Sequence, residues 1–248
     1  MDELFFELHE SLPRQGPGSS ESTRRALSLL ALQTDSPYVL DIGCGPGKQT
    51  VELAKRWPMG MITAVDTHEP YLVELEEHCR REGIQNVYTS RESMFSLPYP
   101  EQSFEVIWSE GAIYIMGFPE GLSAWKPLLK PGGYLVVSEL NWIRPDPPDE
   151  IRQFWEDEYP GITTIEGALH HIKLAGYELE DHFILPNKDW YTEYYTPLSQ
   201  RIDQWKEERS SDPAVKALIN FTREEITMCD TYSRWYSYVF YILRSISH

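Results

Sequence analysis

The stretch Val39–Thr50, V-L-D-I-G-C-G-P-G-K-Q-T, joins an apolar run to three closely spaced glycines and the start of a helical pattern. The apolar run is typical of a buried strand, and the pattern after the glycines is typical of a helix. A buried strand that enters a helix through a glycine turn opens a doubly wound α/β domain. We therefore predict an α/β fold with a ligand site at the glycine turn.

The spacing of the glycines separates two classes of ligand. A dinucleotide fingerprint reads G-x-G-x-x-G, but Lys48 stands where its last glycine belongs. Asp41 opens the pattern D-x-G-x-G-x-G. A pyrophosphate needs bare amides without a nearby anion, so this carboxylate suits a cationic ligand group better. A nicotinamide-dependent oxidoreductase is therefore the weaker alternative.

The segment D-I-G-C-G-P-G, residues 41–47, resembles motif I of the class I S-adenosylmethionine (SAM) methyltransferases. L-P-Y at 97–99, F-E at 104–105 and K-P-G-G at 130–133 are similar to the small-molecule branch of that class. Within this branch the chain resembles the ubiquinone/menaquinone-biosynthesis type (the methyltransferase type 11 family), strongly over residues 37–140. The resemblance implies SAM as cofactor, S-adenosylhomocysteine (SAH) as product, and a first set of cofactor-binding residues: Asp41, Gly43, Gly45 and Gly47.

The resemblance also implies a Rossmann-like class I methyltransferase fold. Its seven-stranded, mostly parallel sheet has the order 3-2-1-4-5-7-6, with helices on both faces. We expect N-terminal helices and a lid over residues 1–36 and the SAM-dependent methyltransferase domain over residues 37–248. Residues 187–235 are mostly polar with helical patterns, which predicts a helical insertion or cap before the closing strand at 237–244.

Composition excludes several classes of protein. A formal net charge of −17 argues against nucleic-acid binding, which needs basic faces, and against anionic membrane surfaces. No apolar run reaches the roughly 18 residues of a membrane span. The three cysteines have no C-x-x-C spacing, which favours a reducing compartment without disulfides and without a metal site. We expect a cytoplasmic protein, either a monomer or a homodimer.

The loop P-R-Q-G-P-G-S-S, residues 13–20, is rich in helix breakers. It is either a linker between two helices or, as the resemblance implies, a lid that closes over the cofactor. In the second case Arg14 and Gln15 are expected to meet the cofactor carboxylate.

Asp66 ends the second apolar strand, about 20 residues after the glycine turn. An acidic residue there is placed to hold the two ribose hydroxyls; the alternative is an ordinary turn residue, with Glu69 capping the next helix. The family's adenine-binding Asp is replaced by Ser93. We expect the hydroxyl of Ser93 or the backbone of Met94 to take the adenine edge.

The fourth strand ends in S-E-G-A-I-Y, residues 109–114. Ligands of open α/β sheets lie at the carboxyl ends of strands near the switch in strand order. Ser109 is therefore expected in the cofactor site, with Glu110 as candidate base and Tyr114 as orienting hydroxyl. The alternative is that Glu110 caps the next helix.

These features predict an enzyme that transfers a methyl group from SAM to a small-molecule acceptor. A base is needed only when the acceptor loses a proton before or during attack. A SAM- or SAH-binding sensor without catalysis is the alternative, since a pocket does not prove turnover. Aromatic residues gather late in the chain, at 142–236. We expect most of them in the core and cap, and a subset around a cationic or flat substrate.

Overall fold

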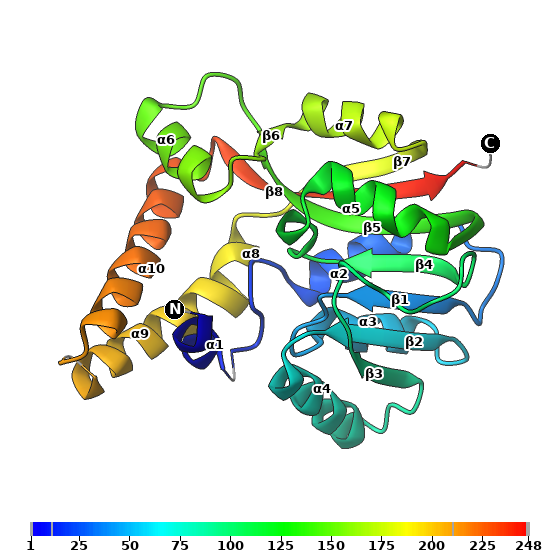
Figure 1. Cartoon of the computed structure of the whole chain (residues 1–248), viewed down its shortest axis with the longest axis horizontal. Coiled ribbons are helices and arrows are strands. Elements are labelled where there is room, and N and C mark those ends of the chain that lie inside the picture. Colours follow the sequence, from blue (N-terminus) through cyan, green and yellow to red (C-terminus); the bar gives the residue numbers. More distant parts are fainter. Residues whose placement is uncertain (1, 11, 210, 247–248) are drawn as a thin grey trace.

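The computed structural model describes residues 2–10, 12–209 and 211–246. One mixed sheet forms the centre of the chain (Figure 1). Its strands, in chain order, are β1 (Tyr38–Ile42), β2 (Met61–Asp66), β3 (Val87–Arg91), β4 (Phe104–Ser109), β5 (Leu129–Trp142), β6 (Thr163–Thr164), β7 (Tyr177–Ile184) and β8 (Tyr236–Ser245).

The strands run in the order β3-β2-β1-β4-β5-β8-β7, with the two-residue β6 beside β5. β1 to β5 pair in parallel, and β8 lies antiparallel between β5 and β7. β7 and β8 are therefore the sixth and seventh long strands. The predicted fold class and the strand order 3-2-1-4-5-7-6 are confirmed.

Helices cover both faces of the sheet. The helical elements are α1 (Asp2–His9), α2 (Ser20–Ser28), α3 (Lys48–Arg56), α4 (Glu69–Glu82), η1 (Ile113–Ile115), α5 (Phe118–Trp125), η2 (Lys126–Leu128), α6 (Asp149–Glu158), α7 (Ile165–Leu174), α8 (Lys188–Trp190), the π-helical turn η3 (Tyr191–Tyr195), α9 (Thr196–Glu208) and α10 (Pro213–Tyr232). Apolar residues of α2, α3 and α4 pack on one face, and those of α5 and α7 pack on the other.

Local sequence explains the first βαβ unit. β1 alternates between the two faces of the sheet, and its last four residues are all buried, as expected of a strand covered on both sides. α4 has Pro70 in its first turn and ends at Gly83, whose φ of 71° suits a left-handed cap. These signals account for the agreement between the predicted and observed elements in this part of the chain.

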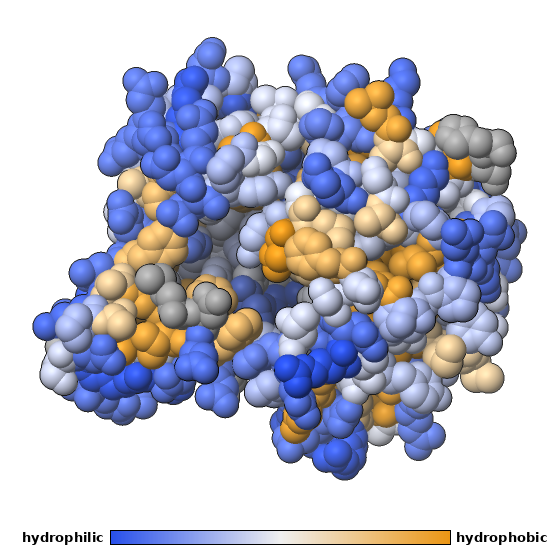
Figure 2. All heavy atoms as spheres, viewed as in Figure 1, coloured by the Kyte–Doolittle hydropathy of each residue, from blue (hydrophilic) through white to orange (hydrophobic). Residues whose placement is uncertain are grey.

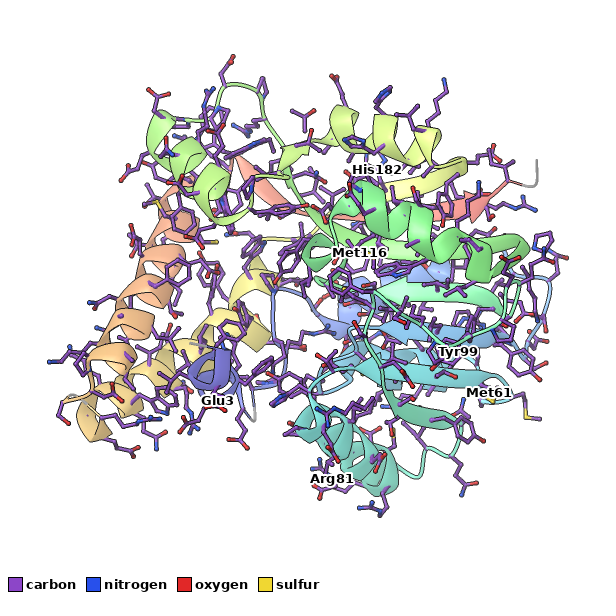
Figure 3. The ribbon with its side chains drawn as sticks, viewed as in Figure 1. Glu3, Met61, Arg81, Tyr99, Met116 and His182 are labelled. Atoms are coloured by element: carbon purple, nitrogen blue, oxygen red, sulfur yellow. The ribbon has the colours of Figure 1, made fainter. Side chains whose placement is uncertain are left out.

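A helical arm, formed by α8, η3, α9 and α10, faces the carboxyl ends of the parallel strands. Figure 1 shows α9 and α10 extending away from the sheet, with α1 beside α9. Figure 3 shows Met61, at the start of β2, on the far side of the sheet from this arm, while Met116, just after η1, lies toward it. The space between arm and sheet is therefore at the end of the sheet where α/β proteins bind ligands.

β5 passes through the glycines of the K-P-G-G segment. It runs from Leu129 to Trp142, and its register against β4 shifts between Phe104 and Val106. This irregularity in the pairing lets the strand continue through Gly132 and Gly133. Within the described residues, no helix is long and apolar enough to span a membrane.

Candidate functional site

A cavity lies where the N-terminal segment crosses the carboxyl ends of β1, β2 and β4. Figure 2 shows the molecule hollowed between the helical arm and the sheet. The lining residues are Phe5, Phe6, Pro13, Arg14, Gln15, Gly16, Pro17, Gly43, Cys44, Gly45, Pro46, Lys48, Gln49, Val65, Asp66, Thr67, Tyr71, Glu92, Met94, Glu110, Gly111, Ala112, Tyr114 and Ile115.

The glycine turn and Asp66 form one wall of this cavity. Gly43 and Gly45 have φ values of 69° and 53°, which L-residues with a Cβ rarely adopt. The backbone N–H of Gly45 donates to Oδ2 of Asp66 at 2.9 Å, and the N–H of His68 donates to Oδ1 at 2.9 Å. Backbone donors thus fix the carboxylate beside the turn, in a half-buried position.

Four predicted cofactor-binding residues do not line the cavity: Ser93, described below, and Asp41, Gly47 and Ser109. Asp41 is fully buried beneath the turn, where Oδ2 accepts from the hydroxyl of Thr50 at 2.6 Å. Burial raises the pKa of Asp41 to about 7, although the bond from Thr50 opposes this shift. Gly47 lies below the cavity as the N-cap of α3. The hydroxyl of Ser109 is buried and donates to the carbonyl of Ile42 at 2.9 Å.

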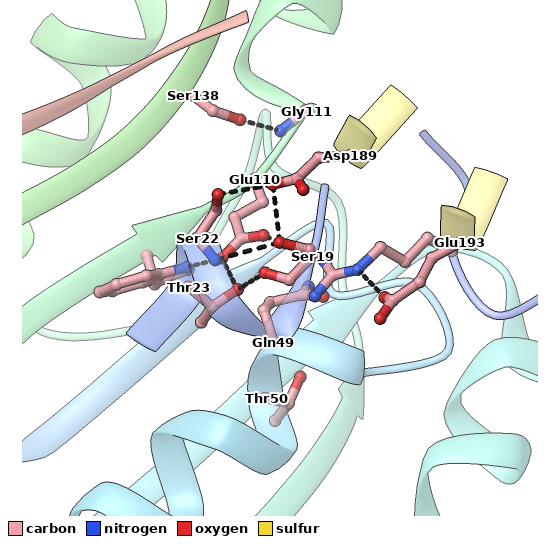
Figure 4. Close-up of polar contacts among 12 residues, drawn as sticks. Ser19, Ser22, Thr23, Gln49, Thr50, Glu110, Gly111, Ser138, Asp189 and Glu193 are labelled. Carbon is pink, nitrogen blue, oxygen red and sulfur yellow. Dashed lines mark hydrogen bonds and ion pairs between the residues drawn. The ribbon is translucent and has the colours of Figure 1, made fainter. Parts of the chain in front are cut away.

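Glu110 lines the cavity, and both of its carboxylate oxygens have partners. Oε2 lies 3.0 Å from Nη1 of Arg14, in an ion pair whose two side chains are 6% and 5% exposed. Oε1 accepts from the hydroxyl of Thr23 at 2.7 Å and from Nε1 of Trp108 at 2.9 Å. Three donors on one carboxylate hold it in one orientation (Figure 4).

Arg14 also reaches the helical arm. Its Nε donates to Oε2 of Glu193 on η3 at 2.8 Å, while its Nη2 is buried without a hydrogen-bond partner among the described residues. The guanidinium thus joins the N-terminal loop, the end of β4 and the arm. The sequence placed Arg14 at the lid, but it gave no signal for Glu193, which pairs with Arg14, or for Thr23, which donates to Glu110.

A second contact fastens the N-terminal loop to the arm. Oδ2 of Asp189 accepts from the hydroxyls of Ser19 and Ser22, both at 2.6 Å, and its carbonyl accepts from the N–H of Gly18 at 3.1 Å (Figure 4). Asp189 is 2% exposed. Buried hydrogen bonds to a charged group are among the stronger ones, so residues 18–22 and the start of the arm form one connected unit.

Gln15 lies over the glycine turn. A Cβ added at Gly45 would meet Cγ of Gln15 at 3.4 Å. The amide oxygen of Gln15 accepts from the hydroxyl of Tyr71 at 2.5 Å, and its amide nitrogen donates to the carbonyl of His9 at 3.1 Å. Gln15 is therefore held from both α1 and α4, and the N-terminal segment closes over the turn.

Met94 lines the cavity, and its carbonyl accepts from Nε1 of Trp125 at 3.3 Å. Ser93 is not among the lining residues; its hydroxyl accepts from the N–H of Phe95 at 3.3 Å. Glu92, one residue earlier, does line the cavity. Glu92 was not predicted as a site residue, although an acidic residue directly after the third strand was an available signal.

Tyr114 lines the cavity on the side that faces the arm, and 40% of it is exposed. Its ring meets the ring of Tyr159 edge to face, with centroids 5.8 Å apart. The late aromatics that were expected to be core residues are largely buried: Trp142, Trp190, Tyr194, Tyr195, Trp205 and Tyr236.

The described part of the chain holds no group of three or more His, Cys, Asp or Glu side chains arranged for a metal ion. Cys44, Cys79 and Cys229 are each buried and free.

Comparisons with known proteins agree with this geometry. Residues 39–133 match a family model described as a methyltransferase domain. Trans-aconitate 2-methyltransferase of Shigella flexneri is 29% identical over 202 residues, which are 75% of this chain and 73% of the relative. Its counterpart in Escherichia coli O157:H7 is 28% identical over the same shares.

Solved structures show the same fold. A SAM-dependent methyltransferase from Thiobacillus denitrificans, in complex with SAH, superposes with a TM-score of 0.85 at 15% identity, covering 99% of both chains. One from Geobacter sulfurreducens, also with SAH, gives 0.82 at 17% identity, covering 98% of both chains. The narrower resemblance to the ubiquinone/menaquinone-biosynthesis type stays a prediction. The glycine turn, the sheet order and the family match identify this chain as a class I SAM-dependent methyltransferase.

Proposed function

We propose that this enzyme methylates a small-molecule acceptor held between the carboxyl ends of the strands and the helical arm. The observation that carries the proposal is the cavity in which the glycine turn, Asp66, Glu110 and Tyr114 meet beneath the N-terminal loop. The cofactor half and the arm-facing half of this cavity adjoin, as methyl transfer requires of two reactants held close together.

The residues around the glycine turn fit SAM. Gly43 and Gly45 leave room for a ligand next to the backbone, and the carboxylate of Asp66 stands beside them as a ribose acceptor. The unpartnered Nη2 of Arg14 is a donor suited to the cofactor carboxylate. Met94 and Glu92 are suited to the adenine edge. When bound, SAM supplies a methyl group that its sulfonium already activates.

We propose a positioning role for Glu110 in place of the predicted role as base. Its oxygens already accept from Arg14, Thr23 and Trp108, so it has little capacity left for a proton from an acceptor. Instead it orients Arg14 toward the cavity. Tyr114 remains our candidate for the hydroxyl that orients the acceptor.

Residues 1–36 act in this proposal as the lid of a methyltransferase domain that spans 37–248, with 187–235 as its cap. Two contacts support a lid that closes together with the cap. Arg14 pairs with Glu193, and Ser19 with Asp189. A closed lid excludes water from the reacting groups.

A polycarboxylate is a second candidate acceptor, because the sequence relatives are named for trans-aconitate. Two cationic side chains, Arg14 and Lys48, occur among the described residues that line the cavity. Arg14 is already paired with two carboxylates. Recognition of a tricarboxylate by this cavity would therefore require Arg14 to leave its present partners.

The test combines binding with turnover. Calorimetry should show one SAH bound per chain, and SAH release from SAM should be measured with a panel that contains trans-aconitate, phenols and amines. Binding with turnover of one panel class supports the proposal. SAH binding without turnover of any acceptor would favour the sensor alternative, and absence of SAH binding would contradict both.

A further inference from the structure

A group of tyrosines and carboxylates adjoins the arm side of the cavity at Tyr114. We call it the tyrosine–carboxylate cluster: Tyr114 (η1), Glu139 (β5), Tyr159 (after α6), Glu225 (α10) and Tyr238 (β8). The hydroxyl of Tyr159 donates to Oε1 of Glu139 at 2.6 Å, and the ring of Tyr159 contacts that of Tyr114. Glu225 accepts from the hydroxyl of Tyr195 at 2.7 Å, and Glu225 and Tyr238 interact electrostatically with Tyr114. The cluster therefore bridges the sheet and the cap next to the cofactor cavity.

The two carboxylates of the cluster act on the hydroxyls of its tyrosines. Although Tyr114 is 40% exposed, protein surrounds it on most sides, and this desolvation raises the pKa of its hydroxyl. The charges of Glu225 and then Glu139 raise that pKa further. Burial likewise raises the pKa of Tyr238, with contributions from the same two carboxylates and from Tyr114.

The two carboxylates lack a cationic partner. Within the described residues neither Glu139 nor Glu225 forms an ion pair, and no lysine or arginine contributes to their pKa shifts. Glu139 is 2% exposed, and its Oε2 is buried without a hydrogen-bond partner in the described part of the chain. A buried carboxylate that no cation neutralises is costly, so a site of this kind gains most from a ligand that brings positive charge.

We propose that the tyrosine–carboxylate cluster is the acceptor site and that it binds a small organic cation with a protonated amine. Glu225 holds the ammonium group, and Glu139 takes a proton from it through the hydroxyl of Tyr159. The inference rests on the proposed function, since it names the acceptor class of the same site.

The chemistry of the cluster matches an amine at each step. Tyrosine rings and hydroxyls bind ammonium groups by cation–π contacts and hydrogen bonds. An amine must lose its proton before its lone pair can attack. In the transfer, one N–H proton passes to the oxygen of Tyr159 while the proton of Tyr159 passes to Oε1 of Glu139. This leaves a neutral amine, an unchanged tyrosine and a protonated Glu139. A polycarboxylate would instead add like charge to two unpaired carboxylates.

The accepting group has a suitable affinity for a proton. Burial raises the pKa of Glu139 to about 8, with the bond from Tyr159 opposing the shift. The titratable groups that it acts on are Tyr159, Tyr114, Tyr238 and Tyr241. Glu225 on α10 acts on Tyr114 and Tyr238 as well. A base with a pKa near the working pH is both available and effective.

Binding is tested with a probe that cannot be methylated or deprotonated. Calorimetry with tetramethylammonium is performed on the enzyme saturated with SAH, and citrate serves as the polycarboxylate probe. We expect tetramethylammonium to bind and citrate not to. Glu225→Gln should weaken tetramethylammonium at least tenfold, whereas Glu224→Gln, on the exposed neighbour in α10, should leave it unchanged.

The outcomes separate this inference from the proposed function. SAH binding without tetramethylammonium binding, or tetramethylammonium binding that Glu225→Gln leaves intact, would overturn the inference alone. Failure to bind SAH would overturn the proposed function and the inference with it. Binding of citrate in preference to tetramethylammonium would assign the site to polycarboxylates instead.

The proton step has its own readout. With ethanolamine, histamine and tyramine as amines, Glu139→Gln and Tyr159→Phe should lower kcat at least tenfold and change KM less. At saturating amine, wild-type kcat should rise with pH as Glu139 loses its proton, and Glu139→Gln should flatten this rise. An unchanged pH profile in Glu139→Gln, or no turnover of any of the three amines, would overturn the assigned role of Glu139.

Discussion

Arg14 and Glu110 form a buried ion pair, with 3.0 Å between Nη1 and Oε2, that ties the N-terminal loop to the end of β4. Both side chains are almost fully removed from solvent, at 6% and 5% exposure. A pair of this kind contributes little net stability, but removing one partner leaves the other charge buried and unpaired. The contact therefore makes closure of the loop depend on a single arginine.

Arg14→Ala is expected to lower the free energy of unfolding by about 3 kcal/mol, since Glu110 then loses its buried partner. It should also weaken SAH binding, because the donor proposed for the cofactor carboxylate is gone. Denaturant titration and calorimetry measure the two effects. Arg24→Ala is the matched control, since Arg24 pairs with Glu52 while 58% exposed, and such surface pairs contribute about 1 kcal/mol or less. Equal losses in the two variants would contradict the role of the buried pair.

Limited proteolysis tests closure of the N-terminal loop by cofactor. Trypsin should cut after Arg14 more slowly when SAH is present, because the closed form binds the cofactor better. Deletion of the residues before Ser19 would not test the lid alone. Leu8 and Leu12 are 0% and 5% exposed and belong to the main core, so this deletion should reduce thermal stability as well as turnover. The lid is refuted when SAH leaves the rate of cutting unchanged.

Asp66→Ala should weaken SAM and SAH at least tenfold. The carboxylate would otherwise accept two ribose hydroxyls, and bonds to a charged group are each worth about 1.5–3 kcal/mol. Calorimetry measures the affinity. Glu69→Ala serves as control, because Glu69 is 67% exposed and pairs only with Arg91 on the surface. Unchanged affinity in Asp66→Ala would assign Asp66 to the turn alone.

Gly45→Ala and Gly47→Ala are expected to differ in what they disrupt. Both glycines have positive φ, so alanine is strained at either site. A Cβ at Gly45 would meet only Cγ of Gln15, at 3.4 Å, beside the cavity, whereas a Cβ at Gly47 would overlap the side chain of Leu75 in the core. Gly45→Ala should mainly weaken SAH in calorimetry, and Gly47→Ala should mainly lower the melting temperature. The reverse pattern would show that Gly45 is needed only for the turn.

Asp41 makes stability depend on pH. Its pKa is raised to about 7 in the folded protein, chiefly by burial, and is near 3.8 when exposed. The folded state then binds a proton that the unfolded state has lost, so stability is lost as pH rises from about 4 to about 7. The slope is about 1.4 kcal/mol per pH unit. Asp41→Asn should remove this contribution in denaturant titrations across that range, and an equal slope in both proteins would contradict it.

Local patterns in the sequence were sufficient for the fold. Alternation of apolar residues, the glycine turn and the caps of α4 are short-range signals, and each predicted strand of the parallel half was found. The length of β5 was not evident from the sequence. The strand continues through Gly132 and Gly133 because its pairing with β4 changes register there. Sequence periodicity contains no information about such a register shift, which depends on pairing with β4.

The sequence also predicted most of the segments that line the cavity. Arg14, Gln15, Gly43, Gly45, Asp66, Met94, Glu110 and Tyr114 all line it. Asp41, Gly47, Ser93 and Ser109 do not. The side chains of Asp41 and Ser109 point into the interior, Gly47 begins α3, and the hydroxyl of Ser93 accepts from the N–H of Phe95. A motif thus fixed which backbone segment meets the ligand, while the direction of each side chain depended on packing.

The sequence alone determined the class of this protein, because the strand, turn and helix signals of a SAM-binding βαβ unit lie within one short, contiguous stretch. Only the tertiary structure decided the partners of the site: Glu193 and Asp189 on the arm for the N-terminal loop, and Glu139 and Glu225 for the proposed acceptor site. These residues lie between 20 and 179 positions from what they contact. Burial and charge bring these side chains together with their partners in the folded protein, and no local sequence pattern predicts such contacts.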